Sequence, residues 1–380
     1  MRIFNKKNVY DAALDRIRWL FDEFPNVVCS FSGGKDSTVC FNLCMIVAKE
    51  KNRLPLSVIF IDQEAEWEAT IDQVKEIMYN PDVKPYWFQI PIKLFNATSV
   101  TENWLDCWNP EKKDLWMHEM DPISIRENKY GTVRFQHLFD KIMEIEFNGI
   151  KSCNISGVRT EESPGRALGL TSGLTYKSVT WGKVISSKNG HYVFCPIYDW
   201  SYTDVWKAIH ENKWAYCEIY NLMYKYGIPT MKMRVSNVHH ETAVGSLFFM
   251  QEVEPQTYAK LTQRISGIDM ASHMGPENYW GSKDVPFMFA NRKEYRDYLL
   301  EKLITNEDWT QRFKRTFNYQ EEVFCNTVLE ELMYKIHIAS ILTNDWEGIK
   351  LRNFACSPQS IPFTKLASAR SKMKKELENA

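Results

Sequence analysis

The chain has 380 residues, more than one hydrophobic core usually covers, so we expect more than one domain. Its net charge of −1 gives no reason to expect direct nucleic-acid binding, and 44% hydrophobic with 25% charged residues is typical of a globular protein. We find no apolar run that could span a membrane and no secretory leader, and the nine cysteines form no Cys-x-x-Cys pair. We therefore expect a cytoplasmic protein with reduced thiols and without a zinc site or an iron–sulfur cluster.

The N-terminal half of the chain alternates between helical and strand patterns. Residues 8–24 place apolar side chains at helical spacing and predict an amphipathic helix. The alternation that follows predicts an α/β fold, a Rossmann-like parallel sheet with helices on both faces and right-handed crossovers. The predicted strands are residues 27–31, 56–61, 84–90 and 151–157, and the predicted helices between them are residues 37–51, 66–78 and 134–147.

A long insertion, at about residues 91–133, separates the third predicted strand from the next helix. It is rich in tryptophan and charge, with Trp104, Trp108 and Trp116 around the run 112–114. Loops of this length are often functional lids. The alternative is a surface excursion that its own aromatic side chains hold in place, and the sequence leaves both readings open.

The pattern changes near residue 235, where the strand alternation is lost and helical spacing prevails. Before that point Ser201 begins a further helix, with Asp204 as the third residue of a capping box. We expect three parts. They are an N-terminal helix over residues 1–24, a nucleotide-binding domain over 25–232 that contains the insertion 91–133, and a mainly helical C-terminal domain over 233–380.

The strongest chemical signal follows the first predicted strand, in the segment Ser32-Gly33-Gly34-Lys35-Asp36-Ser37. A loop between a buried strand and a helix places backbone N–H groups and the positive end of a helix at the carboxyl edge of a parallel sheet, where ligands bind. The glycines let the backbone approach a phosphate, and the lysine and serines supply a charge and hydroxyl donors. Asp36 stands where a Walker A motif has Ser or Thr, so this is a different phosphate loop.

A second candidate follows the fourth predicted strand. Arg159 and Arg166 stand in the turn after Gly157, beside Ser163. Arginine suits a bidentate grip on phosphate or sulfate, although such a turn by itself is also typical of a solvated, charged loop. Because its strand is expected beside the first one, we interpret the turn as a second anion clamp that faces the phosphate loop.

These motifs resemble known families. The Ser-Gly-Gly-Lys-Asp-Ser loop resembles the pyrophosphate loop of the adenine nucleotide α-hydrolase-like superfamily. The turn at 157–167 and the stretch 195–206 resemble the phosphoadenosine phosphosulfate (PAPS) reductase family, over about residues 25–230. The resemblance implies that Asp36 lies near a Mg²⁺ ion in the ATP-using branches and that Lys35, Arg159 and Arg166 are the catalytic residues. The nucleotide-binding residues that it implies are Ser30, Phe31, Ser32, Gly33, Gly34, Lys35, Asp36, Ser37, Phe60, Ile61, Asp62, Gly157, Arg159, Ser163 and Arg166.

The sequence departs from PAPS reductases where those enzymes carry a late nucleophilic cysteine in a Glu-Cys-Gly-x-His context. Residues 233–241 contain no cysteine, and the later Cys325 and Cys356 lack that context, so we expect buried or incidental thiols there. Sulfate reduction is therefore not the expected activity. The pair His239-His240 could suggest a metal or an acid–base group, but adjacent residues do not face one site. We expect one structural and one exposed histidine instead.

The chain resembles a subset of PAPS-reductase-like proteins that lack this cysteine and carry a helical C-terminal domain of unknown function. The junction Arg234-Val235-Ser236 and the tryptophan-rich segment 107–116 carry that resemblance. The subset includes bacterial and phage proteins of the immunoglobulin-binding-regulator co-activator type. It implies a regulatory role and a ParB-like protein partner.

Three functions remain in view. The first is an ATP-using enzyme, a transferase that cleaves ATP between the α and β phosphates and adenylates an acceptor, for which we see no obvious general base. The second is a module that senses ATP, PAPS or a related adenine nucleotide for a protein partner without turnover. The third, which the missing motif disfavours, is a thioredoxin-dependent PAPS reductase. The sequence leaves the acceptor and any homo-oligomer open.

Overall fold

A computed structural model describes residues 6–99, 102, 104–171, 175–186, 190–235, 238–239, 244–273, 285–345 and 348–356. The chain divides into two compact units. The first, the sheet unit, comprises residues 1–94, 106–237 and 249–264. The second, the helical unit, comprises residues 95–105, 238–248 and 265–380. The three predicted domain boundaries stay predictions.

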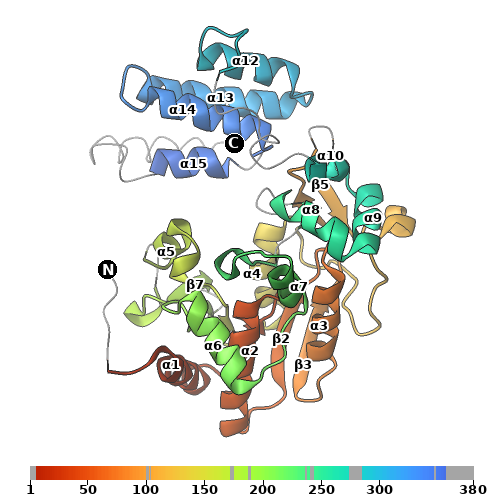
Figure 1. The fold of residues 1–380 in the computed structure, drawn as a ribbon. Helices are drawn as coiled ribbons and strands as arrows, with labels where there is room; N and C mark the ends of the chain where they lie inside the picture. The colour runs from red at the N-terminus through yellow and green to blue at the C-terminus, as the bar shows by residue number, and fades with distance from the viewer. Residues whose placement is uncertain are drawn as a thin grey trace. The chain divides into compact units, whose positions relative to one another are not determined.

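The sheet unit is built on a six-stranded sheet with the order β3-β2-β1-β6-β8-β7 (Figure 1). All neighbours pair in parallel except the edge strand β7, which runs antiparallel to β8. The register places Cys29 of β1 between Val58 of β2 and Ile155 of β6, so the fourth predicted strand does lie beside the first. The strands are β1 (Asn26–Ser30), β2 (Leu56–Ile61), β3 (Val83–Phe88), β6 (Ser152–Ile155), β7 (Gly182–Ser186) and β8 (His191–Phe194).

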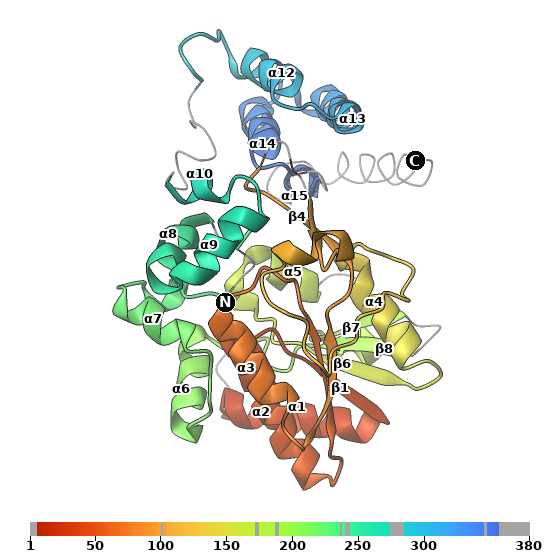
Figure 2. The ribbon, with the colours of Figure 1, turned by 90° about the vertical axis from the view of Figure 1, so that its right-hand side faces the viewer.

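Helices flank this sheet on both sides, and Figure 2 shows α3 and α4 on opposite sides of it. The prediction of a mostly parallel, Rossmann-like sheet covered by helices is confirmed. Asn8 begins the first helix by accepting the Asp11 N–H at 2.8 Å. Ser201 and Asp204 form the predicted capping box. The helices of the sheet unit include α1 (Val9–Glu23), α2 (Lys35–Glu50), α3 (Glu68–Met78), α4 (Phe135–Glu146), α5 (Pro164–Thr171), α6 (Tyr202–Asn212), α7 (Ile219–Lys225) and α9 (Pro255–Arg264).

Two local features differ from the sequence prediction. The helix after the phosphate loop begins at Lys35, two residues before the predicted start, because Gly34 already serves as its N-cap. The hairpin of β7 and β8 was not predicted, because its strands are short and mix polar with apolar residues, so neither shows a buried run. The sheet core is otherwise the expected set of strand and helix residues, with Val28, Val39 and Ile155 fully buried.

The insertion after β3 contains β4 (Ile92–Phe95), β5 (Trp104–Cys107) and the short 3-10 helix η1 (Pro110–Leu115). Trp108 is fully buried, and Trp116 packs edge-on against it at 5.4 Å between ring centroids. The indole N–H of Trp108 donates to the Asp62 carbonyl, just after β2, at 2.9 Å. The insertion is thus held by its own tryptophans, as one of the two readings predicted, and by the sheet edge.

The apolar residues of the helical unit pack into a core of their own around Phe317, Ile341 and Leu351. A buried polar network crosses this core. The ring of His337 stacks on Phe317 with 4.0 Å between ring centroids; its Nδ1 accepts a hydrogen bond from Arg296 at 3.1 Å and its Nε2 donates to Gln320 Oε1 at 2.8 Å. Among the described helices, none has the length and apolar character needed to cross a membrane. The helices are α10 (Ile268–His273), α12 (Arg292–Lys302), α13 (Glu307–Phe324), α14 (Glu330–Leu342) and α15 (Ile349–Cys356); α8 (Val244–Val253) includes residues of both units.

Candidate functional site

The phosphate loop links the end of β1 to the start of α2. Gly33 adopts a φ of +70°, a left-handed conformation that favours glycine, and a Cβ there would lie 2.5 Å from the Cγ2 atom of Thr70 in α3. Gly34 then caps α2 with its backbone, and Lys35 begins the helix with a side chain that is only 6% exposed. The loop therefore packs tightly and presents the N-terminus of α2 at the sheet edge.

The serine hydroxyls of this loop bind one another. The Ser37 hydroxyl donates to the Gly34 carbonyl at 2.8 Å and accepts the Ser32 N–H at 3.2 Å, and the two hydroxyls lie 3.1 Å apart. These contacts hold the loop in the turn that the motif requires. The predicted phosphate role of Ser32 and Ser37 stays a prediction.

Arg159 brings the second predicted turn onto this loop. Its Nε atom donates to Oδ1 of Asp36 at 2.5 Å, although 123 residues separate the two. Gly157, at the end of β6, makes the approach possible, because a Cβ there would lie 2.9 Å from the Asp36 carbonyl carbon. Arg159 is 3% exposed and also donates to the Trp200 carbonyl at 3.3 Å. The structure thus joins the two predicted motifs through one buried ion pair.

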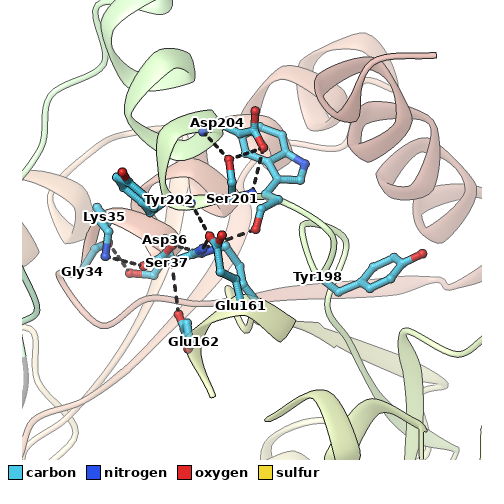
Figure 3. Close-up of polar contacts among 12 residues, drawn as sticks. Gly34, Lys35, Asp36, Ser37, Glu161, Glu162, Tyr198, Ser201, Tyr202 and Asp204 are labelled. Atoms are coloured by element: carbon cyan, nitrogen blue, oxygen red, sulfur yellow. Dashed lines mark hydrogen bonds and ion pairs between the residues drawn. The ribbon is translucent and has the colours of Figure 1, made fainter. Parts of the chain in front are cut away.

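Three carboxylates surround these cations. Lys35 Nζ lies 3.0 Å from Oδ2 of Asp36, and Arg159 lies 3.2 Å from Glu161 and 3.8 Å from Glu162. Figure 3 shows Lys35, Asp36, Glu161 and Glu162 turned toward one another, whereas Tyr198 points away from them. Burial raises the pKa of Glu162 above its usual value, with Arg166 opposing and Asp36 reinforcing the shift. Lys35 and Arg159 therefore each have a carboxylate partner among the described residues.

The structure also places residues at this loop to which the sequence analysis gave no role. The Lys35 N–H, one of the first amides of α2, donates to the Tyr220 hydroxyl at 3.0 Å, and Lys35 Nζ lies 3.4 Å from the Met233 carbonyl. Glu161 accepts the N–H of Tyr202 at the start of α6 at 2.7 Å. Glu161 and Glu162 had one signal, their place in the predicted turn two and three residues after Arg159, and Tyr220 lies within the stretch that resembles the PAPS reductase family.

Arg166 and Ser163 lie farther from the loop contacts. The Ser163 hydroxyl accepts the Arg166 N–H at 3.2 Å and so caps the first turn of α5. The Arg166 side chain is 49% exposed and pairs with Glu162, four residues earlier. Arg166 therefore reaches the site only through Glu162, and its role in an anion clamp stays a prediction.

The remaining predicted nucleotide-binding residues are largely committed to the fold. The Ser30 hydroxyl donates to Asn154 of β6 at 2.8 Å, which ties β1 to its neighbour. Phe31 and Phe60 are 3% exposed and belong to the hydrophobic core, and their predicted place at the nucleotide stays a prediction. Asp62 is fully buried and accepts hydrogen bonds from Trp87 and Gln89 at 3.0 and 2.9 Å. Ile61 is half-buried beside it.

A magnesium ion fits this site only together with phosphates. Both oxygens of Asp36 are already hydrogen-bonded, one to Lys35 and one to Arg159. Within the described ranges, no cluster of three His, Cys, Asp or Glu side chains has a metal-binding arrangement. Mg²⁺ is usually held by one or two carboxylates plus the phosphates of a nucleotide, and Asp36 could supply that single ligand once its partners move to the phosphates.

The other motifs that the sequence analysis weighed give a mixed result. His239 is 2% exposed and so is the structural histidine of the pair, while His240 lies outside the described residues. Cys325 lies in the helical unit, 3.7 Å from the Tyr334 hydroxyl. The side chain of Cys356 and the residue Ser236 also lie outside the described set. The eight cysteines with described side chains are free thiols.

Comparison with protein-family models identifies both parts of the chain. Residues 26–226, just over half of the chain, match the phosphoadenosine phosphosulfate reductase domain. Residues 227–365 match a domain of unknown function, DUF3440. The uncharacterized protein YbdN of Escherichia coli K12 is 26% identical over 286 residues, which cover 72% of this chain and 69% of YbdN.

Two solved structures are similar to part of this chain. A PAPS reductase from Candida auris, in a phosphate complex, is 16% identical and covers 58% of this chain and 93% of its own, with a TM-score of 0.33. An FMN adenylyltransferase from Candida glabrata, bound to FMN and an ATP analogue, is 13% identical and covers 58% of this chain and 64% of its own, with a TM-score of 0.35.

Proposed function

The chain belongs to the phosphoadenosine phosphosulfate reductase domain family, and from this premise we propose that it is an adenine-nucleotide-binding enzyme. It binds ATP at the carboxyl ends of β1 and β6, cleaves it between the α and β phosphates, and transfers the adenylate to an acceptor. One observation carries the proposal: the hydrogen bond of Arg159 to Asp36 joins the two predicted anion-binding turns at one place.

The two buried cations are the groups that stabilise the leaving pyrophosphate. Lys35 and Arg159 are nearly excluded from water, so their charges act in a low-dielectric site, where they stabilise developing negative charge strongly. A polyphosphate that enters must replace Asp36 and Glu161 as their partners. Asp36 is then released toward Mg²⁺, which neutralises phosphate charge when it is bound.

The test measures binding and turnover separately. We expect titration of the protein with ATP and MgCl₂ to release heat, and incubation to yield AMP and pyrophosphate. Lys35→Ala removes a buried cation at the loop and abolishes both signals. Lys49→Ala, on the same helix with an exposed side chain, is the matched control and leaves both within about twofold. ATP binding that is absent, or unchanged in Lys35→Ala, contradicts the proposal.

A regulatory module without turnover is the second candidate, because the described cations of the site are already paired with carboxylates. Such a module binds ATP or PAPS tightly and forms no AMP. Thioredoxin-dependent release of sulfite from PAPS identifies a reductase instead. A cytoplasmic location, a ParB-like partner and a homo-oligomer stay predictions.

A further inference from the structure

The loop after β2 carries three acidic residues next to the phosphate loop. Asp62, Glu64 and Glu66 lie between the end of β2 and the start of α3, and each is at least nine-tenths buried. The strands β1 and β2 are parallel neighbours, so the loops after them share one sheet edge. Thr70, one helical turn beyond Glu66, touches Gly33 of the phosphate loop.

Two of these carboxylates are committed to structural contacts. Asp62 accepts from Trp87, Gln89 and the Glu64 N–H. Glu64 binds Arg264 at 2.5 and 3.0 Å, and it accepts the N–H of Trp108 at 2.6 Å. Both carboxylates therefore help to fix the conformation of the loop.

Glu66 differs from both neighbours. It is 7% exposed, and within the described part of the chain no hydrogen bond or ion pair engages its carboxyl group. The N-terminus of α3, which could have bound it, is occupied by Glu254, whose carboxylate accepts the N–H groups of Glu68 and Ala69 at 2.9 and 3.2 Å. The described residues therefore leave the carboxyl group of Glu66 available for chemistry.

His118, on the insertion, interacts electrostatically with Glu66 and lies close to Asp62. His118 Nε2 lies 3.6 Å from Oδ1 of Asp62, and this buried nitrogen has no hydrogen-bond partner among the described residues. Burial opposes the charge of His118, but the Asp62 carboxylate outweighs it and raises the histidine pKa. A histidine and a carboxyl group are both side chains that can take up and release protons near neutral pH when their pKa values are shifted in this way.

We propose that Glu66 is the general base of the adenylate transfer, which makes the acceptor a hydroxyl or amine compound and deepens the proposed function on which this inference rests. The acceptor oxygen or nitrogen forms a bond to the α-phosphorus of ATP. The bond from that phosphorus to the α,β-bridging oxygen breaks, and pyrophosphate leaves with the electron pair. The acceptor proton goes to the Glu66 carboxylate. A carboxylate acceptor would need no such base.

The groups around Glu66 set the pH at which it works. The pKa of Glu66 is raised to about 8. Burial is the largest cause, the negative charge of Asp62 adds to it, and His118 acts in the opposite direction. Glu64, paired with Arg264, and the buried thiol of Cys107 also face this loop. A base with this pKa is ionised in about a tenth of the molecules at pH 7, so the rate should rise about tenfold per unit below pH 8.

The experiment uses the full chain with ATP, MgCl₂ and water as the acceptor, and it follows AMP between pH 6 and 9. Glu66→Gln should bind ATP within about twofold of the wild type, form AMP at least about 100-fold more slowly, and lose the pH-dependent limb. Glu68→Gln, two residues along and exposed, is the matched control and keeps both the rate and the limb.

The outcomes separate this inference from the proposed function. If Glu66→Gln keeps the wild-type rate and limb while Lys35→Ala is inactive, the proposed function stands and the base is overturned. ATP bound by the wild type without AMP at any pH also overturns it. Absence of ATP binding overturns the proposed function itself.

A second variant and a measurement without turnover test the same group. His118→Gln removes a cation that lowers the pKa of Glu66, so the rising limb of the pH–rate profile should move to higher pH. Each unit by which the limb moves should lower the rate at pH 7 by up to about tenfold. Infrared titration should show a protonated carboxylic acid at pH 7 that disappears above pH 8 and is missing from Glu66→Gln. A limb that stays in place, or a missing acid band, contradicts the proposal.

Discussion

The phosphate loop and the acidic loop after β2 stand on neighbouring strands and manage buried charge in opposite ways. In the phosphate loop, each described cation has a carboxylate partner, and Arg159 alone lies within 4 Å of Asp36, Glu161 and Glu162. In the acidic loop, one arginine serves Glu64, and Glu66 has no described partner. Pairing offsets part of the cost of burying a charge, and a ligand must replace the partner to reach it, whereas an unpaired buried acid keeps its proton and can exchange it. One edge of the sheet can therefore hold both paired cations that could bind an anion and an acid that can exchange its proton.

Arg159→Ala should have the largest effect on ATP binding, because it removes the arginine that pairs with the carboxylates at the phosphate loop. The half-buried Asp36 then keeps Lys35 as a partner and the exposed Glu161 loses its arginine, so the free energy of unfolding should fall by about 1 to 3 kcal/mol. Urea denaturation with circular dichroism measures it, and ATP binding should be lost. A loss below about 1 kcal/mol would mean that water reaches these carboxylates easily.

The pH dependence of the free energy of unfolding tests whether Glu66 is buried without a partner. The folded pKa of Glu66, about 8, lies above its ordinary value of 4.5, so its contribution is fully present below pH 4.5 and is lost as pH rises toward 8. Relative to Glu66→Gln, which does not titrate, the wild type should lose roughly 4 kcal/mol over that range. Denaturation midpoints at several pH values report it, and a constant difference between the two proteins refutes it.

Gly157→Ala tests whether the phosphate loop and the arginine turn must approach each other closely. The new Cβ meets the backbone of Asp36 at 2.9 Å, so β6 and α2 must move apart, at a cost of about 1 to 3 kcal/mol and with weaker ATP binding. Gly169→Ala, in α5 with no atom within 4 Å of its new methyl group, is the control. Thermal unfolding and ATP titration compare them, and equal behaviour of the two variants would show that the close approach is not needed.

The smallest effect is expected for Arg166→Ala, at the exposed end of the ion-pair cluster. Because its side chain is about half exposed, stability should change by less than about 1 kcal/mol. If Arg166 joins the clamp, ATP affinity should nevertheless fall several-fold, more at low salt than at high salt. An affinity that does not change removes Arg166 from the predicted site.

Part of the site could be predicted because it is local. The phosphate loop is contiguous, its strand–loop–helix order is visible in the pattern, and the place of β6 beside β1 follows from the alternation of strands and helices. Arg159 was found for the same reason, since a strand end fixes where its turn lies. Phe60 shows the limit: its place near the end of β2 is visible in the pattern, whereas the packing of its ring in the core is not, and its contact with a nucleotide stays a prediction.

The sequence by itself determined the fold class, the phosphate loop and the arginine turn, because strand and helix periods and short motifs are properties of neighbouring residues. Only the tertiary structure decided that Tyr220 binds the first amide of α2, that Arg264 neutralises Glu64, and that Glu66 is left without a described partner. These facts depend on residues as many as 200 positions apart. Whether a buried carboxylate is paired depends on which side chains surround it in space, and a linear pattern carries no record of that.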